Sequence, residues 1–334
     1  MVTTALWVAV GLIAVALIFD FTNGFHDAAN SIATVVATKT LTPFQAVAMA
    51  AFFNFIVMFF ITFKVAATIG KGIVDPGVVS LTVVFGCLAG AIVWNLITWW
   101  FGIPTSSSHA LVGGLIGASL TATDGNTNVV LSGFYTLLMY IIGAPIIGYL
   151  LGVILNSIVR RIAPEETTTN TTVFRRLQLV SSALYSMGHG ANDAQKTAGI
   201  IFLILVASNQ LPKDGEPPMW AIASCFVVMG LGTLMGGWRI VDTMGRKLTH
   251  LNPRQGFAAE TGGSMMLFVA SSLGIPVSTT HTITGAIMGV GSSEPGQVVA
   301  WRKAAEIGVA WVLTIPASAL MASLFYVAAM SMQG

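Results

Sequence analysis

Residues 102–109 read Gly-Ile-Pro-Thr-Ser-Ser-Ser-His, and residues 274–281 read Gly-Ile-Pro-Val-Ser-Thr-Thr-His. A second pair of blocks recurs in the same order, Gly-Phe-His-Asp-Ala at residues 24–28 and Gly-Ala-Asn-Asp-Ala at residues 190–194. The offset is nearly equal for both pairs. Two blocks that recur in order at one spacing indicate an internal duplication. The chain is therefore predicted to consist of two homologous halves.

The composition indicates the solvent in which these halves fold. Of 334 residues, 55% are hydrophobic and only 8% are charged, whereas an average soluble domain has about a quarter charged residues. This excludes a soluble enzyme, a nucleic-acid binder or a disordered chain. The net charge of +2 gives no reason to expect a nucleic-acid partner. Two cysteines in apolar runs form neither a disulfide framework nor a metal site. We predict an all-α polytopic membrane protein.

Apolar windows place the membrane crossings. A spanning helix needs roughly 20 apolar residues. Ten windows qualify when weaker ones are included: 5–38, 44–63, 78–100, 104–123, 129–159, 177–207, 219–238, 257–273, 277–291 and 304–331. The segments 104–123 and 277–291 begin in polar turns and are weakly apolar. Each is either a short span or a re-entrant piece, and hydropathy does not decide between the two.

The duplication then predicts the topology. The first repeat is residues 1–160, a basic cytoplasmic linker is 161–176, and the second repeat is 177–334. Five crossings in each half make the second half inverted relative to the first. The first and sixth windows are interrupted by polar residues, so we expect broken helices there. Inverted repeats with broken helices that meet at the midplane are the architecture of secondary transporters.

Basic residues orient the chain. With ten crossings, the connections on one side hold eleven cations: Lys39, Arg160, Arg161, Arg175, Arg176, Arg239, Arg246, Lys247, Arg254, Arg302 and Lys303. The other side holds three: Lys64, Lys71 and Lys213. The positive-inside rule makes the first side cytoplasmic. We predict a multi-pass protein of the cell membrane with both termini outside.

Carboxylates at membrane depth are the first candidates for function, because they are costly to insert. Asp27 and Asp193 recur in both halves, each followed by polar residues on the same helical face. Such hard oxygen ligands suit Na⁺ or a proton; the alternative is polar glue between helices. The candidates for cation or proton coupling are His26, Asp27, Asn30, His189, Asn192, Asp193, Gln195 and Glu260. Asp27, Asn30 and Asp193 are the metal ligands if the ion is Na⁺. No resident cofactor is expected.

The Gly-Ile-Pro blocks suggest a site for an anion. Three hydroxyl residues fall where each following helix begins, beside free N–H groups and the positive end of the helix dipole. The alternative is ordinary helix capping. Two copies converging from opposite faces favour anion binding, and the candidates are Ser106, Ser107, Ser108, Ser278, Thr279 and Thr280. His109 and His281 are left open as ligands, proton carriers or packing residues.

The charge balance links the two kinds of site. Asp27, Asp193 and Glu260 face a single clear cation, Lys196, which either neutralises Asp193 or touches the anion. A dianion is repelled by such a site unless cations enter with it. The sequence therefore predicts cation-coupled symport.

The chain resembles the inorganic phosphate transporter (PiT) family. The resemblance rests on residues 23–30 (NGFHDAAN), 188–196 (GHGANDAQK), 238–260 (WRIVDTMGRKLTHLNPRQGFAAE) and both Gly-Ile-Pro blocks, and it runs over nearly the whole chain. The His26-Asp27 version resembles the bacterial low-affinity phosphate transporters.

That resemblance implies symport of inorganic phosphate with H⁺ or Na⁺ across the inner membrane, with metal–phosphate complexes carried by some members. It also implies inverted repeats and a homodimer. The family's cation positions map onto Asp27, Asn30 and Asp193, its phosphate-binding hydroxyls onto residues 106–108 and 278–280, and its functional glutamate onto Glu260. Eukaryotic members have a glutamate where this chain has Asn54, which favours H⁺.

Three alternatives remain. The first is a sulfate permease of the same fold; sulfate cannot donate a proton, so competition by sulfate discriminates. The second, an intramembrane serine hydrolase, would use Ser107 or Ser108 with His109, but adjacent helical residues do not face each other. The third is a channel, which saturable, gradient-driven accumulation would exclude.

Overall fold

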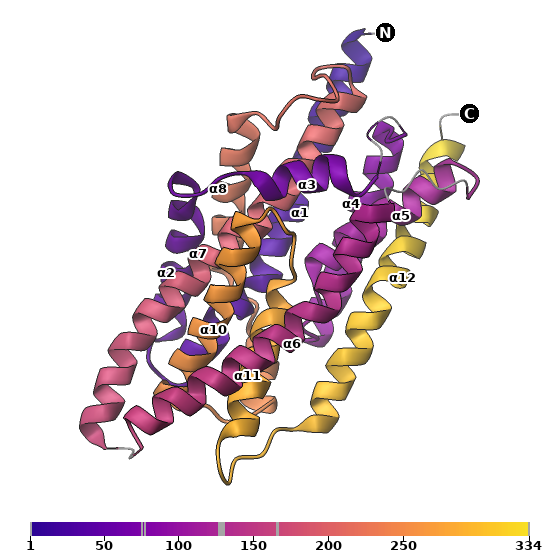
Figure 1. Cartoon of the computed structure of the whole chain (residues 1–334). Coiled ribbons are helices and arrows are strands. Elements are labelled where there is room, and N and C mark those ends of the chain that lie inside the picture. The colour runs from indigo at the N-terminus through magenta and orange to yellow at the C-terminus, as the bar shows by residue number, and fades with distance from the viewer. Residues whose placement is uncertain (1, 75, 77, 126–130, 165–166, 333–334) are drawn as a thin grey trace.

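The computed structural model describes residues 2–74, 76, 78–125, 131–164 and 167–332. All the secondary-structure elements of this part of the chain are helices, which confirms the all-α prediction (Figure 1). Parts of the predicted window 129–159 and of the linker 161–176 lie outside the described residues. The helices are α1 (Val2–Ala37), α2 (Pro43–Ile56), η1 (Val57–Phe59), α3 (Lys64–Gly72), α4 (Leu81–Phe101), α5 (Ser107–Ala122), α6 (Leu131–Ile162), α7 (Thr168–Ala207), α8 (Met219–Met235), α9 (Trp238–Asp242), η2 (Thr243–Lys247), α10 (Pro253–Ser272), α11 (Thr279–Ser293) and α12 (Trp301–Ser331).

Four of these helices are long and apolar enough to cross a membrane: Leu6–Ala37 of α1, α4, Ile141–Ile162 of α6, and α12. The number rises to six if each of two sharply bent helix pairs is one span. The helices α5 and α11 have 16 and 15 residues. At 1.5 Å per residue they extend about 24 Å, which is short of the ~30 Å hydrocarbon core. The ten crossings therefore stay a prediction, with α5 and α11 as its shortest members.

The predicted breaks in the first and sixth windows are wrong. The helices α1 and α7 are continuous over 36 and 40 residues, straight through the polar blocks. Their polar side chains bond side chains of neighbouring helices, so the backbone has no need to open. Bends occur instead between α2/η1 and α3, by 84°, and between α8 and α9/η2, by 64°. Figure 1 shows α3 lying across the bundle after the first of these bends.

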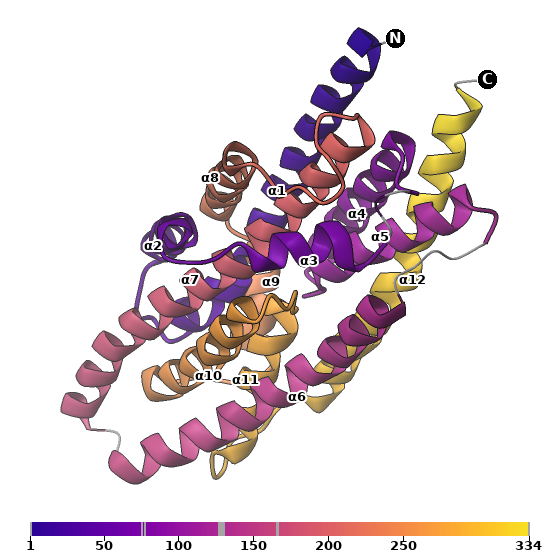
Figure 2. The same ribbon diagram turned by 45° about the horizontal axis from the view of Figure 1, so that its top comes forward.

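The two sequence halves interlock through glycines. The helix α5 packs against α12, and α11 packs against α6 (Figure 2). Gly113 and Gly117 of α5 lie so close to α12 that a Cβ on either would clash with a backbone carbonyl oxygen there. Gly285 and Gly289 of α11 lie equally close to carbonyl oxygens of α6. Each Gly-Ile-Pro block is thus followed by a helix that packs on a long helix of the other half.

The hydrophobic core likewise combines residues from both halves of the sequence. One hydrophobic cluster joins Val112 of α5 to Ala322 of α12. A second joins Ala144 of α6 to Ala286 of α11. Neither half of the sequence therefore forms a separate compact body.

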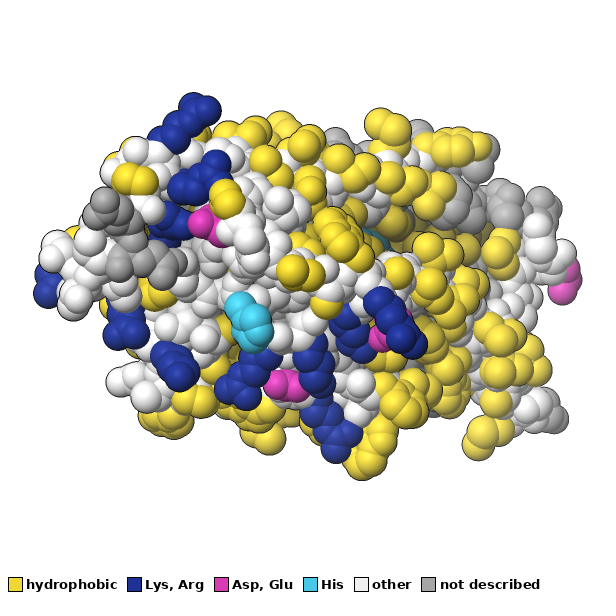
Figure 3. All heavy atoms as spheres, turned by 90° about the horizontal axis from the view of Figure 1, so that it is seen from below, with side chains coloured by type: hydrophobic (Ala, Val, Ile, Leu, Met, Phe, Trp, Pro, Cys, Tyr) yellow, Lys and Arg dark blue, Asp and Glu magenta, His cyan; other side chains and the backbone are white. Residues whose placement is uncertain are grey.

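The two ends of the molecule differ in charge. The start of α1 and the end of α12 lie at the same end of the bundle (Figures 1 and 2). Viewed from the opposite end, Lys and Arg side chains gather on the surface (Figure 3). Exposed cations near that end include Arg175, Arg176, Arg246, Lys247 and Arg302. This arrangement agrees with the predicted separation of the termini from the basic loops; the side of the membrane on which each end lies stays a prediction.

Candidate functional site

The helices α1 and α7 pack together and carry the two central carboxylates. Asp27 of α1 and Asp193 of α7 are both buried. Ligand atoms of Asp27, His189 and Asp193 all lie within 4.8 Å of one another. The structure thus brings the two recurring aspartates, predicted from opposite halves, into one cluster with a histidine.

Asp27 contacts the first Gly-Ile-Pro block. Its Oδ2 accepts a hydrogen bond from Ser107 Oγ at 2.7 Å, and the same hydroxyl lies 2.5 Å from Asn23 Oδ1. The Oδ1 atom of Asp27 lies 2.6 Å from Nδ1 of His26, whose Nε2 lies 3.0 Å from Thr98 Oγ1. The predicted residues His26, Asp27 and Ser107 are therefore in contact.

Asp193 contacts the second block. Its Oδ2 accepts from Thr279 Oγ1 at 3.0 Å and lies 3.2 Å from His189 Nε2. Its Oδ1 accepts from Lys196 Nζ at 2.6 Å. The carboxylate is therefore shared between a cation, a hydroxyl and an imidazole.

Lys196 bridges the two blocks. Besides Asp193, its ammonium donates to Ser108 Oγ at 2.6 Å and to the carbonyl oxygen of Val277 at 2.7 Å. Three acceptors match the three N–H groups of a lysine ammonium. This buried cation lies between the hydroxyls of block 102–109 and the turn of block 274–281.

The six predicted hydroxyls divide into two groups. Ser106 and Ser278 are helix caps, because their Oγ atoms accept from the backbone N–H groups of His109 and His281. The other four face the centre. Thr279 and Thr280 accept from Asn30 Nδ2 at 3.2 and 2.9 Å, while Ser107 and Ser108 make the contacts given above. Capping thus applies to Ser106 and Ser278, and anion binding stays a prediction for the other four hydroxyls.

Glu260 lies apart from this cluster in the hydrogen-bond network. Its carboxylate accepts from Thr34 and Ser181 at 2.5 Å each and from Gln178 at 3.0 Å. All three partners are neutral. Thr34 is one turn of α1 beyond Asn30, so Glu260 is a second acidic position further along the same helices.

The side chains of Asn192 and Gln195 hold backbone segments. Asn192 Nδ2 donates to Ser271 Oγ and to the carbonyl oxygen of Ile275, at 3.2 and 3.1 Å. Gln195 Oε1 accepts from the backbone N–H groups of Val65 and Ala66, where α3 begins. These contacts fix the turn after α10 and the bend before α3, and they do not reach the aspartates.

The histidines that end the two Gly-Ile-Pro blocks are in contact with each other. The rings of His109 and His281 lie edge to face with centroids 4.5 Å apart. His281 also stacks on Trp311 at 3.9 Å, and the indole N–H of Trp311 donates to the carbonyl oxygen of Pro104 at 2.9 Å. Neither histidine contacts the hydroxyl of Ser107 or Ser108 in the bonds described above. The proposed hydrolase would therefore lack its general base.

Sequence reasoning missed several contributors. The sequence leaves the role of Lys196 open between neutralising Asp193 and touching the anion, and it does not single out Asn23, Thr98 or Tyr185. Tyr185 donates from its hydroxyl to the carbonyl oxygen of Thr279 at 2.9 Å. The available signal was a polar side chain inside an apolar window, but that signal does not say which neighbouring helix the side chain faces.

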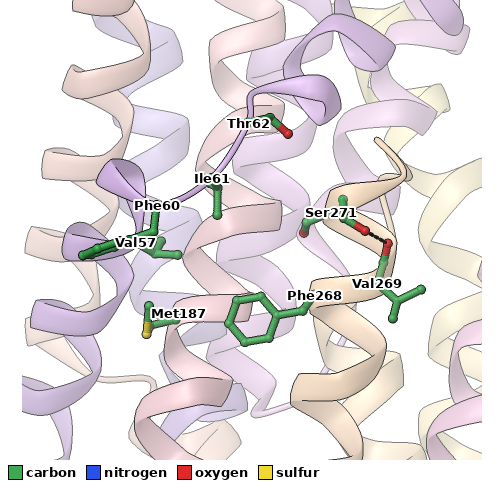
Figure 4. Close-up of a pocket in the computed structure, with 9 residues that line it drawn as sticks. Val57, Phe60, Ile61, Thr62, Met187, Phe268, Val269 and Ser271 are labelled. Atoms are coloured by element: carbon green, nitrogen blue, oxygen red, sulfur yellow. Dashed lines mark hydrogen bonds between the residues drawn. The ribbon is translucent and has the colours of Figure 1, made fainter.

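An apolar cavity elsewhere is a poor match to this chemistry. It has a volume of about 530 Å³ and lies between η1, α7 and α10, lined chiefly by Val57, Phe60, Met187, Phe268 and Val269 (Figure 4). A small dianion needs hydrogen-bond donors, and most of the side chains that line this cavity are apolar. The candidate site is the polar cluster around Asp27, Asp193 and Lys196.

Comparisons with known proteins show what the whole chain is similar to. A model described as the phosphate transporter family matches residues 23–322. The chain is 54% identical to a probable low-affinity inorganic phosphate transporter of Rhizobium meliloti (strain 1021), over 98% of each chain. It is 43% identical to a protein of the same description from Bacillus subtilis (strain 168), over 94% of this chain and 95% of the relative.

A solved structure is also similar. It is described as the sodium-dependent phosphate transporter, and it superposes with a TM-score of 0.85 at 25% sequence identity. The match covers 97% of this chain and 99% of the other.

Proposed function

This chain belongs to the phosphate transporter family and is a transporter rather than an enzyme, and we propose that it is a secondary-active symporter. It moves inorganic phosphate across the membrane together with a cation, by alternating access. The observation that carries this proposal is the meeting of two hydroxyl blocks, two aspartates and one lysine in a single buried cluster.

Phosphate binds between the two blocks. Ser107, Ser108, Thr279 and Thr280 supply hydroxyl donors, and Lys196 supplies a positive charge that already touches both blocks. Ser107, Thr279 and Lys196 now donate to protein acceptors, whereas Ser108 and Thr280 accept from Lys196 and Asn30. Phosphate oxygens replace those acceptors, so binding exchanges one set of charge-assisted hydrogen bonds for another.

The aspartates couple the anion to a cation. A phosphate dianion beside Asp27 and Asp193 is repelled until the carboxylates are neutralised by a proton or by a metal ion. Asn30 offers a further ligand, since its buried Oδ1 has no partner among the described residues. Carboxylate and amide oxygens suit Na⁺, and the similar solved structure is described as a sodium-dependent phosphate transporter.

We favour H⁺ as the coupling ion. His189 lies 3.2 Å from Asp193 and can share a proton with it, while its Nδ1 faces the neutral Oδ1 of Asn54 at 3.3 Å. A glutamate at position 54 would add an oxygen ligand and a negative charge; asparagine adds no charge. A metal–phosphate complex is a second form of the substrate, with Asp27, His189 and Asp193 as ligands.

The moving parts differ from the two halves of the sequence. Rocking of residues 1–160 against 177–334 as rigid bodies conflicts with the glycine contacts of α5 with α12 and of α11 with α6. We propose instead that the block after residue 102 moves with α12, and the block after residue 274 with α6. The repeats are still proposed to be inverted, and the antiparallel contact of α1 with α7 supports this. The homodimer stays a prediction from the family resemblance.

The test is uptake of radiolabelled phosphate into liposomes that contain the purified protein. A pH gradient and a Na⁺ gradient are imposed separately, with sulfate as competitor and with or without a metal chelator. We expect the pH gradient alone to drive accumulation and excess sulfate to leave it unchanged. Uptake that needs Na⁺ contradicts H⁺ coupling, strong inhibition by sulfate favours the sulfate permease, and loss with chelator identifies the metal–phosphate complex.

A further inference from the structure

Asp20 is a buried carboxylate outside the cluster described above. It lies on α1, two turns before Asp27, with no exposed surface. Its Oδ1 accepts a hydrogen bond from Thr197 Oγ1 of α7 at 2.7 Å. Its Oδ2 is buried and has no partner among the described residues. A carboxylate with one free oxygen in the interior needs an explanation.

Asp20 stands at one end of a polar seam between α1 and α7. The seam runs from Asp20–Thr197, through Ser31–His189, to Thr38–Gln178. Eighteen residues of α1 separate its ends, which is about 27 Å of helix. The seam is therefore about as long as the hydrocarbon core is thick. Asp27 lies about two turns of α1, and Asp193 about one turn of α7, from the end that holds Asp20, and Glu260 lies towards the end that holds Thr38.

No cation contacts Asp20. The groups that face it are Asn23 on its own helix, Asp193 from α7 and Cys225 from α8. The nearest lysine along α7, Lys196, has its three N–H groups directed to Asp193, Ser108 and Val277. An ionised Asp20 would be a buried charge with only neutral donors, the hydroxyl of Thr197 and the amide of Asn23, which is unfavourable.

We propose that Asp20 is a proton-binding station between the central aspartates and the end of the bundle that holds the chain termini. It carries the coupling proton while the centre is occupied or reorganising. The proton leaves an Asp20 oxygen, and a new O–H bond forms on Asp27, on Asp193 or on bound phosphate. Asn23 and Ser107 line the route to Asp27, and Thr197 lines the route along α7. This inference rests on the proposed H⁺-coupled symport.

The test compares two activities of Asp20→Asn in liposomes. The first is accumulation driven by a pH gradient; the second is exchange of labelled for unlabelled phosphate at equal concentration and equal pH. Asparagine keeps the shape and a hydrogen-bond acceptor but cannot carry the proton. We expect accumulation to fall to that of protein-free liposomes while exchange persists, and Asp20→Glu to restore accumulation.

Two further variants sharpen the result. Thr22→Val removes a hydroxyl that bonds only the backbone of its own helix, so both activities should remain. Thr197→Val leaves the carboxyl but removes its donor, so the pH at which accumulation is half-maximal should shift.

If Asp20→Asn accumulates phosphate at the wild-type rate, the proposal that Asp20 binds the coupling proton is overturned. The same holds for loss of exchange together with accumulation in both Asp20→Asn and Asp20→Glu, which would make the residue structural. If Asp20→Asn loses Na⁺-driven uptake but keeps uptake driven by the pH gradient, the proton-binding role of Asp20 is also overturned. If neither the pH gradient nor the Na⁺ gradient drives phosphate accumulation by the wild-type protein, the proposed function fails and not merely the role of Asp20.

Discussion

Lys196 is the residue on which the charge balance of the centre depends. Replacing it by Met keeps the length of the side chain but removes donors to Asp193, Ser108 and Val277. A hydrogen bond to a charged group contributes ~1.5–3 kcal/mol. We therefore expect the half-saturating phosphate concentration to rise by roughly tenfold or more, measured as the concentration dependence of exchange. An unchanged value would remove Lys196 from the anion site.

The two central aspartates are expected to be needed for coupling. Asp27→Asn and Asp193→Asn keep the hydrogen-bonding shape but cannot take up a proton or balance a cation. Accumulation against a gradient should be lost in each, while the protein still inserts and purifies. Normal accumulation by either variant would exclude that carboxylate from coupling.

The hydroxyls allow a direct separation of binding from capping. The double change Ser107→Ala and Thr279→Ala removes two inward donors, so phosphate affinity should fall by roughly tenfold. The matched control is Ser106→Ala with Ser278→Ala, which removes the two caps. Each lost cap costs about 0.5–2 kcal/mol of stability, so the melting temperature should fall while affinity changes little. The opposite pattern would contradict the assignment.

At the scale of single residues, the sequence predicts which residue types form the candidate site better than it predicts which side chains contact one another. Duplication pointed to Asp27, Asp193 and the hydroxyl blocks, which are in contact. It did not separate Ser106 from Ser107, because only the local φ and ψ decide which hydroxyl caps the helix. The polar side chain of Gln195 in an apolar window predicts a coupling residue, whereas its amide bonds the start of α3. Helical periodicity gives a face, not the partner opposite that face.

Among the elements, the glycine faces of α5 and α11 make a sharp prediction. A Cβ at Gly289 would clash with the carbonyl oxygen of Tyr149 on α6. Gly289→Ala should therefore destabilise the protein by about 1–3 kcal/mol. Gly308→Ala in α12 is the matched control: a Cβ there meets nothing within 4 Å, and the helix gains about 1 kcal/mol or less. Thermal unfolding in detergent measures both, and equal melting temperatures would refute the close contact.

The elements also show where hydropathy fails. Apolar windows located the long helices α4 and α12 well, because lipid-facing helices are apolar on most sides. Polar residues in the windows of α1 and α7 predict breaks that do not occur, because a buried helix can carry polar groups when its neighbours bond them. The bend at Gly236 falls on a Gly-Gly pair, a break signal that apolar windows do not register, and the bend near Thr62 has no comparable signal.

For the whole molecule, orientation is the testable quantity. The native cysteines Cys87 and Cys225 are both buried, so a single introduced cysteine reports its own exposure. Ser331→Cys at the end of α12 should react with a membrane-impermeant maleimide on intact cells, because the termini are predicted outside. Arg246→Cys, at the basic end, should react only after permeabilisation. Reversed labelling would invert the predicted topology.

The exchange of partners between α5 and α12 has a consequence for how the protein is made. Ribosomes deliver α5 early and α12 last, with about 180 residues between them. The glycine face of α5 therefore has no packing partner in α12 until synthesis is nearly complete, whereas α11 is synthesised sooner after its partner α6. A chain that stops short of residue 301 would lose more than its last helix: the first hydroxyl block would be left without its support.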